Sequence, residues 1–264
     1  MSTRRRRTRR VLGIIAGSVA AVLVLAVIGF VIWANDTYAA EPEALAEVAH
    51  DERVMVAERD GVIVMSPSEQ AMSEQAMSPS EQVEPSGLVF FAGAKVEPEA
   101  YEATFRETVA AGQTVVIVQS LLNLPLFETR PLSDFTSVAP EVDSWAVGGH
   151  SMGGVKACMF ADSEPDVVEA LVLFASYCAD DSLASRDDLV VLSLSATNDG
   201  LATPEKIEAS IPDLPERTRI EAIEGAVHAQ FGAYGEQPGD GTPTISDEQA
   251  RVEITKALEA LVGA

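Results

Sequence analysis

From Gly87 onward, short apolar runs alternate with helical stretches. This alternation constrains the fold strongly, because parallel strands need crossover connections that are usually helices, and these helices cover both faces of the sheet. We therefore predict an α/β domain with a mostly parallel sheet between two layers of helices. Strands are expected at 88–91, 114–119, 144–147, 170–175, 189–195 and 219–223, and helices at 98–111, 131–138, 152–162, 204–210 and 246–262.

A predicted hairpin and an insertion of low-complexity sequence precede this alternation. Residues 54–57 and 61–65 are short enough for the two strands of the hairpin, and Arg59-Asp60-Gly61 supplies the turn. A low-complexity insertion follows at 65–86, in which the motif Met-Ser-Pro-Ser-Glu-Gln occurs twice. Because the insertion is polar and poor in β-branched residues, we predict a flexible surface segment.

The N-terminal region differs in character from the rest of the chain. Residues 11–33 carry no charge and only one polar side chain, Ser18, and six arginines precede them. As a helix rising about 1.5 Å per residue, this run spans roughly 34 Å, which is enough to cross the hydrocarbon core of a bilayer. A secretory signal has a shorter apolar region and a small-residue cleavage site, for which Ala39-Ala40 is a poor match. We therefore favour an uncleaved membrane anchor over a cleaved signal.

The anchor defines the predicted domain organisation. Arginine-rich flanks stay on the cytoplasmic side of a membrane, which places the body of the chain outside it. We predict a single-pass protein of the cell membrane with an extracytoplasmic domain. Its parts are a basic cytoplasmic tail at 1–10, a transmembrane helix at 11–33, a linker at 34–50 and the domain at 51–264.

The formal charge of -23 is unevenly distributed. The first 35 residues hold six arginines and no acid, so the remainder has 12 basic and 41 acidic residues and a charge of -29. Phosphate contacts require clustered lysines and arginines, so a body this acidic is a poor candidate for binding nucleic acid or an anionic lipid surface. We interpret the charge as a source of solubility and expect no nucleic-acid partner.

Cys158 and Cys178 are the only cysteines. An exported compartment would permit them to form a disulfide, but two small buried apolar residues fit the sequence equally well. A zinc site is excluded here, because two cysteines without nearby histidines cannot complete a tetrahedral shell. We expect neither a metal nor an organic cofactor.

One motif carries chemistry. Gly149-His150-Ser151-Met152-Gly153 matches G-x-S-x-G and lies between a predicted strand and a predicted helix. In a nucleophile elbow the serine takes a strained backbone conformation, and glycines two before and two after it let strand and helix approach. No G-K-[ST] follows, so a phosphate loop is excluded. Ser151 is the candidate nucleophile, and a glycine-rich helix start without chemistry is the alternative.

A serine hydroxyl is a weak nucleophile until a base takes its proton, so a histidine is required. The chain has three. His50 lies in the linker, and His150 adjoins the serine inside the elbow and is expected to point away from it. His228 lies in a glycine-flanked loop after the last predicted strand, at the sheet edge where ligands bind in open α/β sheets. His228 is therefore the candidate base.

The base needs an acid that holds its tautomer and stabilises the imidazolium. Asp199 lies in a turn-rich loop after the strand expected at 189–195 and completes the chain order Ser, Asp, His. Asp180 and Asp181, after the preceding strand, are its rivals. We favour Asp199.

A tetrahedral intermediate also needs N–H donors for its oxyanion. One candidate is the N–H of Met152, which follows the nucleophile at a helix N-terminus. The second is expected in the turn after the strand at 88–91, where we choose Ala94; a simple strand-to-helix turn is the alternative.

Four blocks in order resemble a compact bacterial α/β-hydrolase family related to dienelactone-hydrolase-type enzymes. They are residues 90–101, the G-H-S-M-G-G sequence at 149–154, residues 198–207 and residues 224–232, and residues 237–241 belong to the same pattern. The resemblance covers about residues 50 to 262 and implies an α/β-hydrolase fold. It also implies Ser151, Asp199 and His228 as a catalytic triad with a donor near Ala94. The repeat at 65–82 departs from the pattern.

These residues together predict a serine hydrolase that cleaves small-molecule, ester-type substrates through an acyl-enzyme on Ser151. No insertion is long enough for a large lid, so we expect an open, shallow pocket suited to small or surface-presented esters. Two alternatives remain, namely a cell-envelope acyltransferase and a binding protein without catalysis. The sequence leaves the substrate and the oligomeric state open. Candidate rim residues are Leu121, Leu122, Leu124, Leu126 and Phe127.

Overall fold

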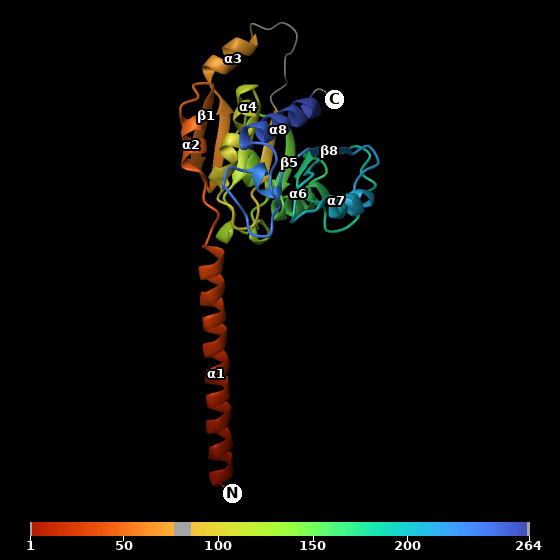
Figure 1. Cartoon of the computed structure of the whole chain (residues 1–264). Coiled ribbons are helices and arrows are strands. Elements are labelled where there is room, and N and C mark those ends of the chain that lie inside the picture. Colours follow the sequence, from red (N-terminus) through yellow and green to blue (C-terminus); the bar gives the residue numbers. More distant parts are fainter. Residues whose placement is uncertain (1, 77–85, 263–264) are drawn as a thin grey trace. The chain divides into compact units, whose positions relative to one another are not determined.

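The computed structural model of the chain describes residues 2–76 and 86–262 (Figure 1). It divides into two compact units, Met1–Asp36 and Thr37–Ala264. The first unit is one helix, α1 (Ser2–Ala34). Its segment Ile14–Ala34 has 21 residues with a mean hydropathy of 2.8, so it is long and apolar enough to cross a membrane. Because an N-terminal signal sequence has the same properties, α1 is a candidate span without a determined topology.

The second unit is built on an eight-stranded sheet in the described part of the chain, with the order β1-β2-β4-β3-β5-β6-β7-β8. The pairs β1–β2 and β2–β4 are antiparallel, and all other neighbours are parallel. The six strands expected after Gly87 are present, so the mostly parallel sheet is confirmed. The strands are β1 (Val54–Arg59), β2 (Val62–Pro67), β3 (Ser86–Phe91), β4 (Thr114–Val118), β5 (Ser144–His150), β6 (Val168–Phe174), β7 (Val190–Ala196) and β8 (Arg219–Ile223).

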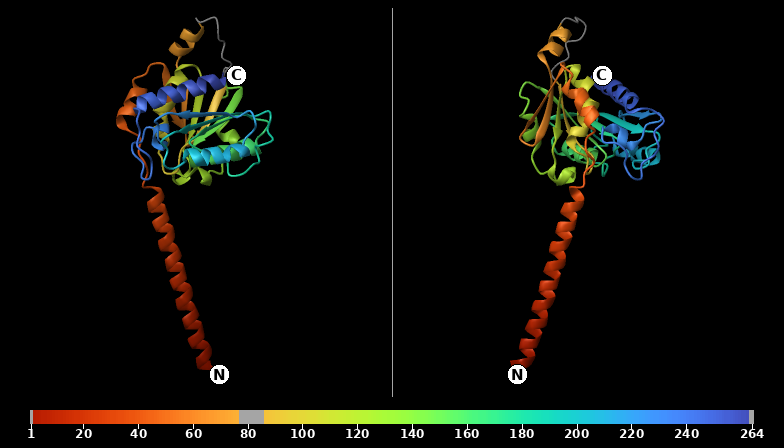
Figure 2. Two further views of the ribbon diagram at one scale, coloured as in Figure 1. Left: turned by 45° about the vertical axis from the view of Figure 1, so that its right-hand side comes forward. Right: turned by 60° about the vertical axis from the view of Figure 1, so that its left-hand side comes forward.

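Helices cover both faces of the sheet, as expected (Figure 2). Residues of α2, α4, α7 and α8 enter one hydrophobic core, and residues of α5 and α6 enter a second core on the opposite face. Every residue of β4 is buried, because a central strand of such a sheet is covered from both sides. The helices are α2 (Pro42–Ala49), α3 (Glu69–Ala76), α4 (Glu102–Ala110), α5 (Leu132–Thr136), α6 (Met152–Ser163), α7 (Pro204–Ser210) and α8 (Asp247–Val262), with 3-10 helices η1 (Pro98–Tyr101), η2 (Leu121–Asn123), η3 (Pro125–Phe127), η4 (Ile211–Asp213) and η5 (His228–Phe231).

The opening hairpin is present, but the insertion after it is not wholly irregular. Asp60 and Gly61 turn the chain between β1 and β2 with φ of 53° and 73°, which is the backbone that a tight hairpin turn requires. Part of the insertion, expected as a flexible segment, forms the helix α3. Its first turn is stabilised because the Ala71 side chain is buried and the Ala71 N–H donates to Ser68 Oγ at 3.3 Å. The second copy of the repeat, at 77–82, lies outside the described residues.

The second unit starts earlier than the predicted domain boundary at residue 51. It includes residues 37–50, which were expected as a linker. Ala44 and Val48 lie one turn apart on α2, and both are buried in the core that α4 and α8 also line. These buried side chains explain why the segment belongs to the globular unit.

Candidate active site

Ser151 connects β5 directly to α6, as the motif predicts. Its φ of 53° and ψ of -120° form a strained backbone conformation that a non-glycine residue adopts only when its surroundings hold it there. Two hydrogen bonds do so. The Ser151 N–H donates to Phe174 O at 3.0 Å, and Ser176 Oγ donates to the Ser151 carbonyl oxygen at 2.6 Å. Ser151 itself is half-buried.

The glycines around Ser151 are required by close backbone contacts. A Cβ on Gly153 would lie 2.0 Å from Phe91 O, and one on Gly149 would lie 2.2 Å from the carbonyl carbon of Gly153. Both contacts are with backbone atoms, which cannot move aside as a flexible side chain would. The spacing of glycines in the motif therefore follows from the packing of α6 against the ends of β3 and β5.

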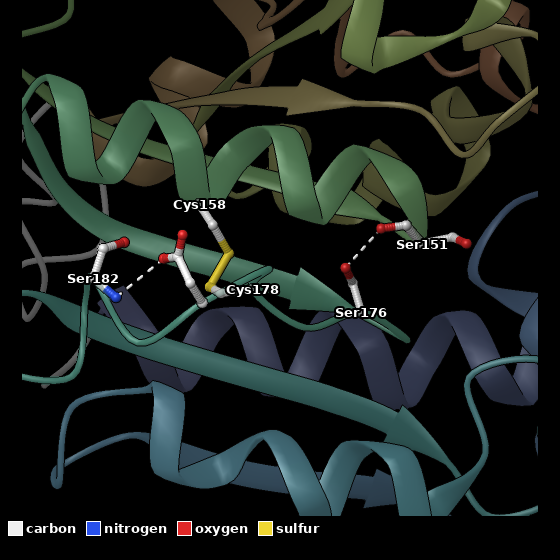
Figure 3. Close-up of a disulfide and its surroundings, with 6 residues drawn as sticks. Ser151, Cys158, Ser176, Cys178 and Ser182 are labelled. Atoms are coloured by element: carbon white, nitrogen blue, oxygen red, sulfur yellow. Dashed lines mark hydrogen bonds between the residues drawn. A yellow bond between two sulfur atoms is a disulfide. The ribbon is translucent and has the colours of Figure 1, made fainter.

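A disulfide fastens the same helix to the loop after β6. Cys158 on α6 is bonded to Cys178, 20 residues further along the chain (Figure 3). Ser176, which hydrogen-bonds the Ser151 carbonyl, lies in the same loop as Cys178 (Figure 3). The sequence left the state of the two cysteines open, and the structure pairs them.

Asp199 and His228 are joined by a hydrogen bond. Asp199 follows β7, and His228 opens η5 after β8. The Nδ1 of His228 donates to Asp199 Oδ2 at 2.8 Å, and the two side chains are 2% and 0% exposed. Asp199 Oδ1 accepts the N–H groups of Leu201 and Ala202 at 2.7 and 2.8 Å. This arrangement places a proton on Nδ1 and leaves Nε2 as the nitrogen that can accept one.

The rival acids lie elsewhere. Asp180 is exposed and accepts the N–H of its neighbour Ser182 at 3.1 Å. Asp181 is also exposed. Among the described residues, Asp199 is the aspartate that is hydrogen-bonded to the imidazole of His228.

Asp240 is a residue whose role the sequence did not reveal. Its carboxylate accepts the N–H groups of Gly200 at 3.1 Å, His228 at 3.2 Å and Ala229 at 2.8 Å. Asp240 therefore ties the loop of Asp199 to the loop of His228. Its position in a Gly-Asp-Gly turn was the available signal, but a turn composition does not say which loops the turn will contact.

His150 lies beside His228 rather than apart from the site. The two imidazole centroids are 4.4 Å apart. His150 Nδ1 is hydrogen-bonded to the Tyr101 hydroxyl at 2.8 Å, and that hydroxyl accepts the Gly93 N–H at 2.9 Å. Burial lowers the pKa of His150 well below its ordinary value, and the neighbouring His228 adds to the effect. His150 therefore resists protonation and packs as a neutral side chain against the candidate base.

This neutral state makes stability depend on pH. The unfolded chain takes a proton at residue 150 as the pH falls below about 6.5, whereas the folded chain resists it. The free energy of unfolding should therefore fall between pH 6.5 and 5 with a contribution of up to about 1.4 kcal/mol per pH unit. Urea unfolding of His150→Gln should show a smaller loss over this range. His50→Gln, at an exposed histidine, should behave like the unmodified chain; equal slopes in all three proteins would contradict the prediction.

Ser151 and His228 do not share a hydrogen bond within the described residues. His228 reaches the elbow through its contact with His150, the residue that immediately precedes the serine. Hydrogen bonds between a nucleophile and its base are often long or poorly aligned before substrate binds. The structure thus brings Asp199 and His228 together directly and places the imidazole beside the elbow.

The two candidate oxyanion donors lie on neighbouring segments. Met152 is the first residue of α6, where an N–H has no acceptor inside the helix. Ala94 follows β3 and is half-buried, and in the described chain its N–H donates to no protein acceptor. The end of β3 contacts the elbow at Gly153. Both N–H groups are therefore available to a bound ligand.

Comparison with known protein families shows to which family the chain belongs. The family model described as the alpha/beta hydrolase family matches residues 87–252, more than half of the chain. The chain belongs to the alpha/beta hydrolase family. Membership assigns it to a family of hydrolases and confirms the fold expected from the sequence. A search of the curated proteins finds no match.

Solved structures of other hydrolases are similar to this chain in fold at low sequence identity. The dienelactone hydrolase from Anabaena variabilis is 13% identical with a TM-score of 0.55, covering 79% of this chain and 98% of its own. A predicted CIB-like hydrolase from Thermoplasma acidophilum is 13% identical with a TM-score of 0.50, covering 78% and 97%. At these identities the likeness concerns the fold alone.

Proposed function

We propose that this alpha/beta hydrolase is a serine hydrolase that cleaves ester-type substrates through an acyl-enzyme on Ser151. The observation that carries the proposal is the buried Asp199–His228 hydrogen bond, set against an elbow in which Ser151 has a φ of 53°. A buried, oriented imidazole next to the elbow that holds the serine is suited to activating its hydroxyl.

The reaction would run in two steps. Ser151 Oγ attacks the ester carbonyl carbon while His228 Nε2 takes the hydroxyl proton, and the N–H groups of Ala94 and Met152 donate to the oxyanion. The bond to the leaving alcohol breaks as His228 returns the proton to the alcohol oxygen. A water molecule then attacks the acyl-enzyme with His228 again acting as base, which releases the acid and restores Ser151.

The loop after β4 borders the proposed oxyanion turn and favours small or surface-presented esters. Lys95, next to Ala94, donates its N–H to Asn123 O at 2.7 Å. Leu121, Leu126 and Phe127 in this loop are exposed, while Leu124, expected at the rim, is buried in the interior. Exposed apolar side chains at the border of a site suit the acyl or alkyl part of an ester.

The proposed location of the protein is the cell membrane. The apolar part of α1 supports a single membrane anchor, and the arginines before it favour a cytoplasmic N-terminus with the hydrolase unit outside.

A fluorophosphonate probe tests the proposed nucleophile. The folded full-length chain should be labelled at Ser151, Ser151→Ala should not be labelled, and Ser176→Ala should keep its labelling at residue 151 even if the rate falls. Product analysis with added alcohols separates hydrolysis from transfer, because an acyltransferase would form a new ester instead of the free acid. Absence of labelling at Ser151 would favour a binding protein on the same fold.

A further inference from the structure

The first residues of the second unit pack against two loops of the proposed site. We call residues 37–41 the strap. The N–H of Tyr38 donates to Lys95 O at 2.7 Å, and the N–H of Glu97 donates to Tyr38 O at 3.0 Å. Tyr38 thereby forms an isolated parallel bridge with Val96. The strap thus adds a short backbone pairing to the turn that carries Ala94.

Side-chain contacts fasten the strap to the same turn. Glu97 Oε1 accepts the Thr37 hydroxyl at 2.8 Å, and Glu97 Oε2 accepts the Ala40 N–H at 3.2 Å. One carboxylate therefore holds both sides of Tyr38. The Lys95 ammonium lies 5.8 Å from the centroid of the Tyr38 ring, a distance at which a cation is attracted to an aromatic face.

The strap also reaches the segment that follows His228. The N–H of Glu41 donates to Ala233 O at 2.9 Å, and the Tyr38 ring lies 5.8 Å from the Tyr234 ring. Tyr234 is buried, and its ring lies 6.3 Å from His150, which contacts His228. The strap therefore bridges the oxyanion side and the base side of the proposed site.

The backbone conformation of Lys95 depends on these contacts. Lys95 has a φ of 64°, a left-handed conformation that is unfavourable for a residue with a side chain and must be held by its surroundings. Its N–H is held by Asn123 and its carbonyl by Tyr38. If the strap were lost, Lys95 could relax, and the adjacent Ala94 N–H would leave its position.

We propose that the strap is a positioning segment of the active site, which holds Lys95 and thereby aims the Ala94 N–H at the oxyanion; this rests on the proposed function. The strap begins three residues after α1 ends at Ala34. Cleavage after Ala39 or Ala40 would remove Tyr38 and break its two backbone hydrogen bonds. The active form therefore retains the strap, so cleavage after Ala39 or Ala40 would not release an active hydrolase.

The test uses full-length chain in detergent micelles and two substitutions, Tyr38→Ala and Glu97→Ala. We expect kcat for a soluble ester to fall about 10- to 100-fold, less than the loss of an entire oxyanion donor, while KM changes less than about threefold. Inhibition by a trifluoromethyl ketone, which forms a tetrahedral oxyanion adduct on the serine, should weaken by a similar factor. Tyr38→Phe should keep both values, because it keeps the ring and the backbone.

Glu169→Ala is the matched control. Glu169 also accepts a hydrogen bond from a hydroxyl on a neighbouring segment, Ser144 Oγ at 2.7 Å. This contact lies at the starts of the parallel strands β5 and β6, whereas the proposed site lies at the ends where these strands finish. The Glu169→Ala variant should hydrolyse the ester and bind the ketone like the unmodified chain. Unchanged kcat and ketone affinity in both Tyr38→Ala and Glu97→Ala, or a rise in KM with unchanged kcat, would overturn the proposal.

Two further measurements keep the outcomes separate. A protease site inserted between Asn35 and Asp36 releases the folded unit with its strap, and kcat should survive; a loss of kcat on release would assign the effect to the anchor and not to the strap. Ser151→Ala is measured alongside. If the rate of the unmodified chain does not depend on Ser151, the proposed function itself fails, whereas a Ser151-dependent rate that ignores the strap refutes the strap alone.

Discussion

His228→Ala is expected to lower kcat for ester hydrolysis by about 10⁶-fold, the largest effect of any single substitution in this chain together with Ser151→Ala. Without this imidazole, the site loses the base that takes the proton from Ser151 as the oxygen attacks. The neighbouring imidazole of His150 is a poor replacement, because its Nδ1 is hydrogen-bonded to Tyr101 and not to an acid, and burial lowers its pKa. The measurement is kcat with a chromogenic ester, with each variant purified as full-length chain.

The double variant Ser151→Ala/His228→Ala provides a sharper check. Residues that act as one unit give effects that do not add, so the double variant should be no slower than either single variant. His50→Ala is the matched control, because His50 is an exposed histidine at the end of α2. A His228→Ala enzyme that retains a tenth of the original kcat would rule out residue 228 as the base.

Asp199→Asn is expected to lower kcat by about 10⁴-fold with little change in structure. The two side chains are nearly the same size, so the hydrogen bonds to Leu201 and Ala202 can be kept through the amide oxygen. The amide nitrogen would then face His228 Nδ1 and donate to it, which moves the imidazole proton to Nε2 and leaves the wrong nitrogen toward Ser151.

Asp180→Asn tests the rival acid under identical conditions. Asp180 is exposed and accepts only a local hydrogen bond among those described for its side chain, so its substitution should leave kcat within about twofold. Fluorophosphonate labelling of Asp199→Asn should slow by a factor similar to that of kcat. If Asp180→Asn were the slower enzyme, the acid would have to be reassigned.

Local features of the sequence were sufficient for the elbow and for the elements around it. The alternation of apolar runs and helices reflects burial on both faces of the sheet. This burial can be predicted from each strand alone, because a strand covered on both faces is apolar along its length. Gly149 and Gly153 could be predicted because they belong to the G-x-S-x-G motif, whose spacing around Ser151 is local in the sequence. His228 could be chosen because two other histidines were eliminated, and Asp199 because chain order favoured it.

Other features could not be read from local pattern because they join residues far apart in the chain. The helix α3 depends on the burial of Ala71 in the folded unit, which overrides a composition that predicts a flexible segment. The role of Asp240 requires two loops to meet it, and the packing of His150 against His228 requires strands β5 and β8 to be placed in one sheet.

The sequence by itself determined the sheet with its helices, the nucleophile turn and the choice of the three candidate triad residues. Each of these follows from residue spacing within a short segment or from the small number of candidate residues. Only the tertiary structure decided that Cys158 bonds Cys178, that Asp240 clamps the acid and base loops, and that residues 37–41 join the hydrolase unit. These contacts depend on which surfaces meet after the chain has folded, and partners separated by up to about two hundred residues leave no periodic signal in the sequence between them.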